Sequence, residues 1–470
     1  MLFRSIPRRP GRHLFVNPNA LLNAPPYNDV EERAAASLAD ALAVAEPNDT
    51  IFVVREHTQT VSAAQLEVPV NNLTLAGLAG RYLPPITNAW GMMANYDHDQ
   101  PHPVLDGDDQ QRVLLISAKS DVTVSGFLIR DGQTTSDGGA GIRVVSGRDI
   151  TIGHSKFLNN RAGGNGGAME FTICQSSIVE RCQFGTGSNL FNSAVKGGAL
   201  AFADSEVQVR DSRFLVNLGS SGGGAVYVST LFDSVPKPVF SSCEFIGNKG
   251  LGGFPAGGGA IFVENAYADV FNSLFHSNSA SHGGAIATRG TAVVGSSGKV
   301  VVHDSLFTRN EGFNGGGALA MYGTVETAIS FDYGFIGGSE MEIYNSRLES
   351  NICTLAHGGA AIVTAIGSSL KAHDCDFIAN RAPGTGSESD GGAIAVGSLA
   401  GRTRYNEFVR CRFERNYSNN GGGAIYHTTG GASIGSDLEF YENEGEKGGA
   451  FEGSEWSYFD YTNIIVGAVG

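Results

Sequence analysis

Short runs in which apolar and polar residues alternate occur along most of the chain, and a period of two is the pattern of half-buried β-strands. Val207 and Val209 form one such pair, and Val300 and Val302 form another. Inside the repeats there is no helical period. Strands this short cannot bury an apolar face alone, but strands stacked on equivalent neighbours bury a continuous column. The pattern therefore predicts an all-β solenoid.

The alternating runs belong to a repeated unit. It reads apolar-x-apolar, two bend residues, Ser/Cys-x-Phe-x-x-Asn, a polar loop, and Gly-Gly-Ala-apolar-x-apolar. The Ala of Gly-Gly-Ala recurs about every 31 residues between Ala140 and Ala450. Leu348 replaces Phe in one unit, and Phe184 has Gly187 where the unit requires Asn. The Phe/Asn pairs are Phe157/Asn160, Phe214/Asn217, Phe245/Asn248, Phe275/Asn278, Phe307/Asn310, Phe377/Asn380, Phe413/Asn416 and Phe440/Asn443.

Each unusual residue of the unit has a structural explanation if the units stack in parallel. Phe fills one corner of the core, and Asn suits a left-handed bend and bonds to the Asn of the next unit. Gly-Gly permits a sharp turn without a Cβ clash. The Ser/Cys position is a small buried slot, so free buried thiols are expected there, with disulfides only between adjacent units. Cysteine occupies this slot at Cys182, Cys243, Cys375 and Cys411.

The two bend residues are turn-prone, and we assign them, with the histidines among them, to turn roles. His427 falls where other units have an inward apolar residue, so we expect a core histidine with hydrogen-bond partners. The bend pairs are Arg210-Asp211, Phe271-Asn272, His303-Asp304, Tyr344-Asn345 and His373-Asp374.

The paired Phe-x-x-Asn and Gly-Gly-Ala motifs resemble the repeat of chlamydial polymorphic outer membrane proteins and of many bacterial surface proteins. Residues 103–132 are similar to the first segment of proteins in the pectate-lyase-like superfamily. The resemblance implies an all-β fold: one single-stranded right-handed parallel β-helix of about 10–11 rungs with an N-terminal capping helix. Because this fold carries adhesins, lyases, hydrolases and virion spikes, it does not by itself determine function.

Outside the repeats, the sequence predicts an N-terminal extension at 1–30, an N-terminal cap at 31–100, the β-helix at 101–455 and a C-terminal tail at 456–470. Residues 31–46 have the pattern of an amphipathic helix, and strands are expected within 47–54 and 71–77. The helix would cover the strand edges at the N-terminal end. The tail either folds over the last rung or joins a partner chain, so homo-oligomerisation through this end is one expectation.

Composition narrows the classes of partner. The formal net charge of −15 disfavours nucleic-acid binding. No run of 18 apolar residues predicts a transmembrane segment. Residues 1–16 lack the apolar core of a Sec-type signal peptide. From the resemblance we expect an extracellular or cell-surface location, with a virion or an intracellular location as alternatives.

Aromatic side chains supply the candidate ligand contacts. In Gly-Gly-Ala-apolar-x-apolar the x side chain should face solvent, which makes Tyr227 beside Phe262, and also Tyr426, an exposed platform for a sugar ring or a protein. The alternative is that loops cover this row. An insertion at 322–340 would form either a ligand-contacting ledge or a hairpin packed on the solenoid. Its aromatic residues are Tyr322, Phe331, Tyr333 and Phe335.

Asp106, Asp108 and Asp109 form a candidate Ca²⁺ site, because calcium takes several oxygen ligands. The same Asp-Gly-Asp-Asp sequence is also ordinary turn chemistry. Zinc spacings, P-loops and nucleophile motifs are missing from the sequence, and no acidic ladder with a neighbouring Arg or Lys follows consecutive strands. We expect no other cofactor.

These features predict a non-enzymatic elongated scaffold: a surface, adhesin-like or envelope structural protein that binds a glycan or a protein partner. The prediction depends on uniform repetition without a convergent catalytic cluster. The alternative is a polysaccharide lyase or glycoside hydrolase that acts in a groove along the β-helix.

Overall fold

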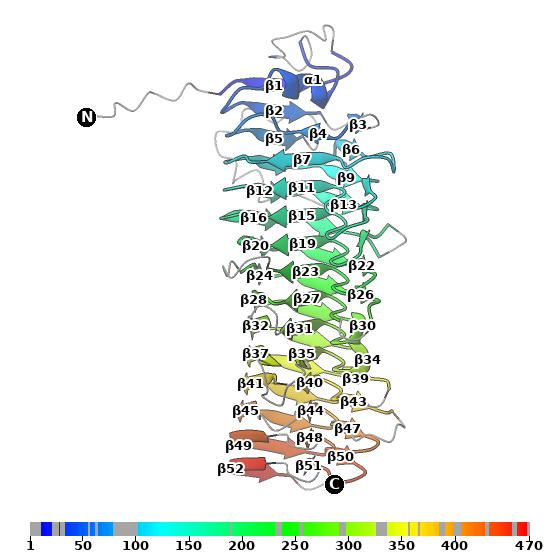
Figure 1. Ribbon diagram of the computed structural model, residues 1–470, viewed down its shortest axis with the longest axis vertical. Coiled ribbons are helices and arrows are strands. Elements are labelled where there is room, and N and C mark those ends of the chain that lie inside the picture. The colour runs from blue at the N-terminus through cyan, green and yellow to red at the C-terminus, as the bar shows by residue number, and fades with distance from the viewer. Residues whose placement is uncertain are drawn as a thin grey trace, which may run out of the picture.

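The computed structural model describes residues 11–20, 28, 33–54, 57–61, 64–78, 102–187, 190–230, 237–253, 257–290, 298–325, 336–355, 358–364, 367–384, 391–397, 406–427, 432–453 and 458–467. They form a solenoid whose turns stack along one axis, from α1 (Leu38–Ala43) and β1 (His13–Val16) at one end to β52 (Tyr458–Val466) at the other (Figure 1). Neighbouring turns pair as parallel strands in three sheets.

The 27-stranded sheet has two rows of strands that are joined within each turn by the bend residues. The first row is β1, β2 (Thr50–Val53), β5 (Thr74–Gly77), β8 (Thr123–Ser125), β12 (Thr151–Gly153), β16 (Ser177–Glu180), β20 (Val207–Arg210), β24 (Val239–Ser241), β28 (Tyr267–Phe271), β32 (Gly298–His303), β37 (Ser339–Tyr344), β41 (Ser369–His373), β45 (Asn406–Val409), β49 (Ala432–Tyr441) and β52. The second row is β3 (Thr58–Thr60), β6 (Val104–Asp106), β9 (Leu128–Arg130), β13 (Lys156–Leu158), β17 (Gln183–Phe184), β21 (Arg213–Leu215), β25 (Glu244–Ile246), β29 (Leu274–His276), β33 (Leu306–Thr308), β38 (Arg347–Glu349), β42 (Asp376–Ile378) and β46 (Arg412–Glu414).

The other two sheets complete each turn. The 11-stranded sheet is β10 (Gln133–Thr134), β14 (Arg161–Ala162), β18 (Ser193–Ala194), β22 (Leu218–Gly219), β26 (Lys249–Gly250), β30 (Ser279–His282), β34 (Glu311–Gly315), β39 (Ile352–Cys353), β43 (Arg381–Ala382), β47 (Tyr417–Ser418) and β50 (Glu444–Gly445). The 14-stranded sheet is β4 (Leu66–Glu67), β7 (Leu114–Ser117), β11 (Ile142–Val145), β15 (Met169–Thr172), β19 (Leu200–Ala203), β23 (Val226–Ser229), β27 (Ile261–Glu264), β31 (Ile286–Gly290), β35 (Leu319–Val325), β40 (Ile362–Thr364), β44 (Ile394–Val396), β48 (Ile425–His427) and β51 (Phe451–Gly453), with β36 (Ile336–Gly337) paired to β35.

The solenoid has more turns than the ten or eleven counted from the repeated motif. Thirteen strands of the 14-stranded sheet follow one another in parallel, from β4 to β51. The count from sequence was too low because it began at Ala140, before β11, and so omitted β4 and β7, which do not follow a Gly-Gly-Ala motif. The region predicted as a cap therefore already contains stacked solenoid strands.

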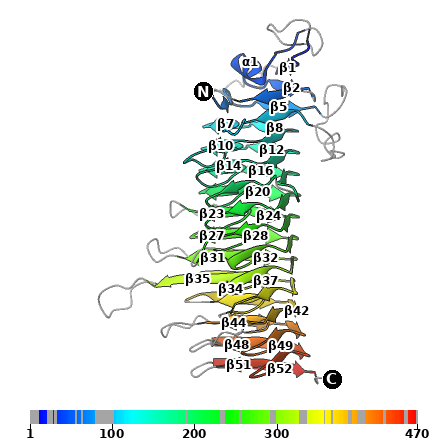
Figure 2. The same cartoon turned by 90° about the vertical axis from the view of Figure 1, so that its right-hand side faces the viewer.

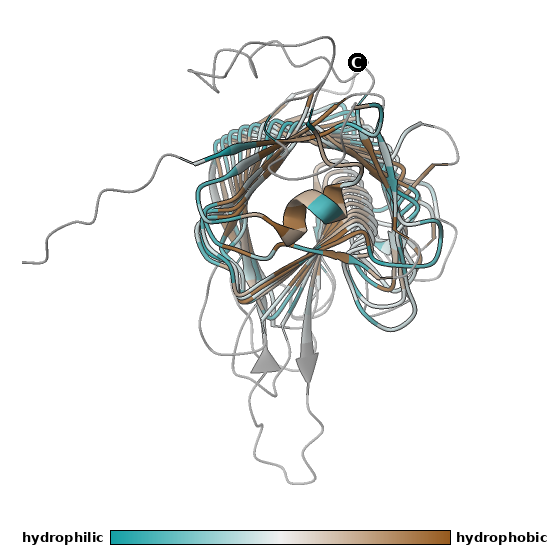
Figure 3. Ribbon diagram, turned by 90° about the horizontal axis from the view of Figure 1, so that it is seen from above, coloured by the Kyte–Doolittle hydropathy of each residue, from teal (hydrophilic) through white to brown (hydrophobic). Residues whose placement is uncertain are grey.

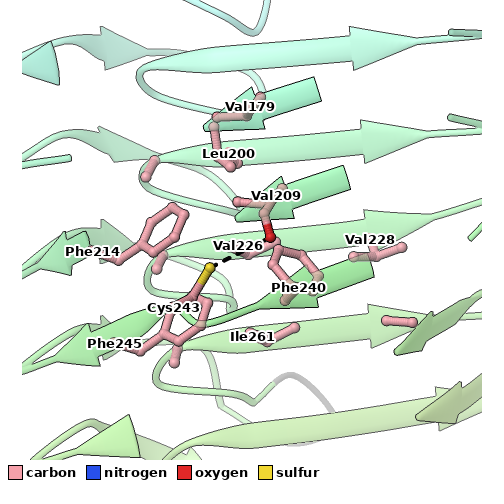
Figure 4. Packing of buried hydrophobic residues seen from close by; sticks show 14 of the residues in the cluster. Val179, Leu200, Val209, Phe214, Val226, Val228, Phe240, Cys243, Phe245 and Ile261 are labelled. Carbon is pink, nitrogen blue, oxygen red and sulfur yellow. Dashed lines mark hydrogen bonds between the residues drawn. The ribbon is translucent and has the colours of Figure 1, made fainter. Parts of the chain in front are cut away.

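The repeated Phe forms a column through the core, as the parallel stack requires. The rings of Phe214, Phe245, Phe275 and Phe307 are fully buried, and successive ring centroids lie 4.6 to 4.7 Å apart with nearly parallel planes. Figure 4 shows Phe214 above Phe245, with the Cys243 thiol donating to the Val209 carbonyl at 3.5 Å. The prediction that Ser and Cys share a small buried position is thus confirmed, and all six cysteines are buried thiols without a disulfide.

The repeated Asn forms a hydrogen-bonded ladder beside the Phe column. The Asn278 backbone N–H and Nδ2 both donate to the Asn310 Oδ1 at 3.0 Å, and Nδ2 also donates to the Phe245 carbonyl at 2.9 Å. The ladder is continuous through the unit that has Gly187, because Asn192 forms the hydrogen bonds of the ladder in that unit. Its members are Asn160, Asn192, Asn217, Asn248, Asn278, Asn310, Asn351, Asn380, Asn416 and Asn443.

The left-handed bend that we assigned to the ladder Asn lies one residue earlier. Val216, Ser277 and Arg309 each precede a ladder Asn and have φ between 53° and 58°, whereas the ladder residues do not have positive φ. The bend residues Asn272 and Asp304 adopt the left-handed conformation instead, which fits the turn role predicted for the bend pairs. Gly-Gly also has the predicted role: Gly283 has φ +61°, and a Cβ on Gly284 would lie 2.2 Å from the Gly317 carbonyl oxygen.

Each end of the solenoid is finished differently. Figure 3 shows α1 lying over the interior at the N-terminal end, where Leu38, Ala41 and Leu42 are buried in the core. This helix is shorter than the predicted 31–46 and begins at the N-cap Ser37. At the C-terminal end, β52 pairs in parallel with β49 and adds one more strand to the sheet. In the part of the chain that the structure describes, no helix is long and apolar enough to cross a membrane.

Candidate functional site

A long groove follows the outside of the corner between the two rows of the 27-stranded sheet. Its volume is about 700 Å³, and it crosses five successive turns. Four turns contribute the left-handed bend residue, the Ser/Cys slot residue and the residue after it, and the fifth contributes Asp374 and Asp376. The lining residues are Ser242, Cys243, Glu244, Asn272, Ser273, Leu274, Asp304, Ser305, Leu306, Asn345, Ser346, Arg347, Asp374 and Asp376.

A column of half-buried aromatic rings borders this groove. Phe271, His303, Tyr344 and His373 are in register on neighbouring strands, and each immediately precedes a groove-lining residue. Ring centroids lie 5.1 Å apart for Phe271 and His303, and 4.8 Å apart for His303 and Tyr344, both in stacked geometry. Tyr344 and His373 meet edge to face at 5.4 Å. An aromatic margin of three stacked rings and one edge-to-face ring therefore borders four of the five turns of the groove.

Cross-turn hydrogen bonds hold the polar side chains of the groove in place. The Asn345 Nδ2 donates to the Asp304 Oδ1, and Arg410 binds the two carboxylate oxygens of Asp374 at 2.6 and 2.7 Å. The hydrogen bond from Arg410 lowers the pKa of Asp374. Arg347 forms an ion pair with Glu349 at 3.0 Å.

Acidic side chains outnumber basic side chains among the residues that line the groove. Four acidic side chains and one basic side chain line it. Beside it, burial and the hydrogen bond to Glu342 raise the pKa of Tyr344 to about 12, so this hydroxyl stays a neutral donor. Such a surface repels anions and can bind hydroxyl groups through carboxylate and amide oxygens.

The aromatic row predicted from the x positions is buried, so the prediction that it faces solvent is wrong. Tyr227 and Tyr426 are each 7% exposed and Phe262 is 1% exposed. Tyr322, which was predicted from the insertion and not from this row, is 4% exposed. The glycine turns of neighbouring units cover the row: a Cβ on Gly222 would lie 3.2 Å from the Phe262 ring.

Polar contacts also cover this row. The Tyr227 hydroxyl donates to Glu264 at 2.7 Å, and the Lys196 Nζ lies 4.6 Å from the centroid of the Tyr227 ring. Phe331, Tyr333 and Phe335 lie outside the described residues. At the described ends of the insertion, β35 and β36 pair antiparallel, and Figure 2 shows β35 running out past its neighbours.

At the predicted calcium site, protein groups form hydrogen bonds with the Asp106 carboxylate. The Asp106 carboxylate accepts hydrogen bonds from Arg130 at 2.6 and 2.9 Å and from the Asp108 backbone N–H at 2.9 Å. Asp108 and Asp109 have φ of 54° and 53°, as expected for the turn alternative. Among the described residues, no group of three or more His, Cys, Asp or Glu side chains is placed to hold a metal ion.

Asp109 instead belongs to a second, smaller pocket of about 430 Å³. Its wall includes the nearly buried Arg112, which donates to Gln65 at 2.8 Å and to the Gly139 carbonyl at 3.1 Å. The lining residues are Gln65, Asp109, Gln110, Gln111, Arg112, Gln133, Thr134, Thr135, Ser136 and Asp137.

Two carboxyl groups share an arginine next to this pocket. Arg143 forms ion pairs with Asp137 at 3.2 Å and with Glu170 at 3.0 Å. Burial raises the pKa of Glu170, although Arg143 and Arg112 oppose the shift. Asp137 is 56% exposed, so the two carboxyl groups lie in different environments.

Sequence reasoning missed the aromatic margin of the corner groove. The residues were visible in the bend pairs, but we assigned them to turns. An alignment of the repeats would show an aromatic ring at the same bend position in four successive units, which a turn does not require. His427 has the predicted role, since it is fully buried and is 2.8 Å from the Ser433 hydroxyl.

Family comparisons agree with the architecture. Residues 112–307 match the model of the right-handed β-helix region, and residues 410–428 match the Chlamydia polymorphic membrane protein repeat. A search of curated proteins found no match.

Several solved structures are similar to this chain at low identity. A tailspike protein variant of E. coli bacteriophage HK620 in complex with a pentasaccharide is 10% identical over 97% of this chain and 80% of that chain, with a TM-score of 0.44. PfbA, a surface adhesin of Streptococcus pneumoniae, is 10% identical over 91% and 86%, with a TM-score of 0.30. The catalytic domain of a GH87 α-1,3-glucanase in complex with nigerose is 9% identical over 99% and 69%, with a TM-score of 0.35. The chain is a right-handed parallel β-helix repeat protein, with repeats like those of chlamydial polymorphic membrane proteins.

Proposed function

We propose that this protein is a non-enzymatic, adhesin-like surface scaffold that binds a neutral glycan along its corner groove. The observation that carries the proposal is the groove itself: about 700 Å³ over five turns, with carboxylate and amide side chains on the floor and four aromatic rings along one margin. Aromatic rings pack against the apolar faces of sugars, carboxylates accept hydrogen bonds from sugar hydroxyl groups, and amides both accept and donate them.

The repetition of the groove favours a polysaccharide over a protein partner. Asn272, Asp304, Asn345 and Asp374 present the same kind of polar group at one position in successive turns, which are about 4.8 Å apart. A polysaccharide also presents the same hydroxyl groups in every repeat, whereas a peptide changes its side chains from residue to residue. A regular ligand therefore matches a regular surface.

The negative charge of the groove indicates the class of glycan. A lyase substrate carries a uronate carboxylate that must be neutralised by a positive group, but Asp304, Asp374 and Asp376 carry the same negative charge as the uronate. Of the nearby arginines, Arg347 is paired with Glu349 and Arg410 is paired with Asp374. We therefore infer a neutral polymer as ligand, at an extracellular or virion surface.

The test is a panel of soluble polysaccharides, neutral and uronate-rich, measured by calorimetry and by release of unsaturated products. The proposal predicts binding to a neutral member, no binding to uronates and no cleavage of either. Replacing Asp304 by Asn keeps the hydrogen-bonding shape, as Asn345 already does one turn later, and should weaken the discrimination against uronates. Binding and cleavage of a uronate polymer by the wild-type protein would refute the proposal.

A second candidate function is glycoside hydrolysis at the smaller pocket. It is favoured by Asp137, an exposed carboxylate that lines the pocket, and by Glu170 beside it, a carboxyl group whose pKa is raised by burial. Glycosidases use two carboxyl groups in different environments as base and acid. Release of reducing ends from a neutral polysaccharide, abolished by Glu170→Gln, would support this function. Equal release by the wild type and the variant would exclude Glu170 as the acid.

A further inference from the structure

Two of the buried cysteines lie directly above one another. Cys375 follows β41 and Cys411 follows β45, and the register of the flanking strands places one opposite the other. The other slot cysteines have serine neighbours instead: the Cys182 backbone N–H donates to the Ser212 hydroxyl, and that of Cys243 donates to the Ser273 hydroxyl. Cys375 and Cys411 are thus the stacked pair among the six cysteines.

The geometry of neighbouring parallel strands suits a covalent bond between them. Strands in one sheet lie about 4.8 Å apart, within the range of about 4.4–6.8 Å that Cα atoms of a disulfide span. Both residues are 1% exposed and both side chains point into the core. Their thiols donate to nearby carbonyls, Cys375 to His373 at 3.2 Å and Cys411 to Ala372 at 3.1 Å.

We propose that Cys375 and Cys411 form a disulfide when the chain folds in the presence of a disulfide oxidant such as oxidised glutathione. The Cys375 thiolate attacks the oxidant, forms a mixed disulfide and releases one glutathione thiol. The Cys411 thiolate then displaces the second glutathione thiol, and the two protein sulfurs are joined. One oxidised glutathione is reduced to two thiols, and the two cysteine protons go to the released thiolates.

The bond forms during folding and not afterwards. The neighbouring Cys411 thiol and burial raise the pKa of Cys375, so little thiolate exists in the folded state. Because thiol–disulfide exchange requires a thiolate and access for the oxidant, the folded, reduced protein reacts slowly.

The position of the pair gives the bond a mechanical consequence. The N-terminal end of the core is covered by α1, whereas at the C-terminal end Phe451 is 39% exposed and Val466 is 63% exposed. A solenoid loses its end repeats first, since each repeat contacts only its neighbours. A bond between Cys375 and Cys411 ties together two neighbouring turns in the C-terminal part of the described solenoid and hinders their separation.

The experiment compares protein refolded from denaturant with mixed oxidised and reduced glutathione against protein refolded with dithiothreitol. We expect the first sample to be lighter by two hydrogen atoms, with the cross-link mapped to Cys375 and Cys411 by non-reducing peptide mass spectrometry. The Cys375→Ser and Cys411→Ser variants should each show no such decrease in mass, whereas the Cys182→Ser variant should still show it. Serine is the natural occupant of the same slot at Ser305 and Ser346, so these variants are expected to fold.

Two further measurements separate the proposal from adventitious oxidation. Hydrogen exchange in the last turns should slow in the cross-linked wild type and stay unchanged between the two redox samples of Cys375→Ser. The folded, reduced protein should gain no cross-link when glutathione is added later. A cross-link that maps to another pair, or a fully reduced protein after oxidative refolding, overturns the proposal.

Discussion

Replacing Asn310 by Ala tests the Asn ladder at its centre. Asn310 is fully buried and takes part in four hydrogen bonds with the turns before and after it, apart from the bond of its own backbone N–H. The change leaves the Asn278 backbone N–H and one amide hydrogen of Asn278 without an acceptor. Each orphaned buried group costs about 1–3 kcal/mol, so the loss of stability should be about 2–6 kcal/mol.

Asn314→Ala is the matched control four residues away. Asn314 is half-buried and donates to the Ser281 hydroxyl at 2.9 Å, so its loss should cost only about 0.5–1.5 kcal/mol. Because repeat arrays do not always unfold in one step, hydrogen exchange of the peptide that contains Asn278 is read beside the urea midpoint. A midpoint for Asn310→Ala no lower than that of Asn314→Ala, with unchanged exchange at Asn278, would refute the ladder as a source of stability.

Further predictions concern the core, the turns and the N-terminal end. Phe275→Ala should lower the free energy of unfolding by about 3–5 kcal/mol in urea titrations, and Phe275→Leu by less, because Leu348 already occupies the same column. Gly284→Ala should prevent folding or lower the thermal midpoint strongly, since its Cβ would collide with backbone, whereas Gly253→Ala, with nothing within 4 Å, should match wild type. Burial opposes ionisation of Asp49, but hydrogen bonds from an arginine side chain and from backbone outweigh burial and lower its pKa. The stability that ionised Asp49 contributes is fully present above the pKa of the unfolded state, about 3.9, and is lost as the pH falls through the lower pKa of the folded state. Asp49→Asn should therefore be less stable than the wild type at pH 7, and it should lose less stability than the wild type on acidification.

The repeated motif was enough to predict the fold, because each motif position has one role in a parallel stack. Phe275 packs on Phe245 and Phe307, and Asn278 bonds to Asn310, as the pattern requires. A local motif could not locate Asn192, since the insertion before it shifts the spacing while the tertiary register is kept.

The surface was predicted less well, because exposure depends on segments from neighbouring turns. Tyr227 and Phe262 alternate with inward-facing residues, and this pattern predicts that their side chains face solvent. The glycine turns of other units nevertheless cover them. The groove margin was missed for the opposite reason: His303 and Tyr344 are separated by a whole turn in sequence, and only the stacking brings their rings together. Periodicity within one strand carries no information about either arrangement.

The most direct test of the account measures affinity for the neutral polysaccharide that binds the wild type best, with two tyrosine variants. Tyr344 belongs to the aromatic margin of the groove, and Tyr267 points outward from the far end of a neighbouring strand. The account predicts that Tyr344→Ala raises Kd about tenfold or more, equivalent to about 1.4 kcal/mol, while Tyr267→Ala leaves Kd unchanged. Equal affinities for wild type and Tyr344→Ala would contradict it.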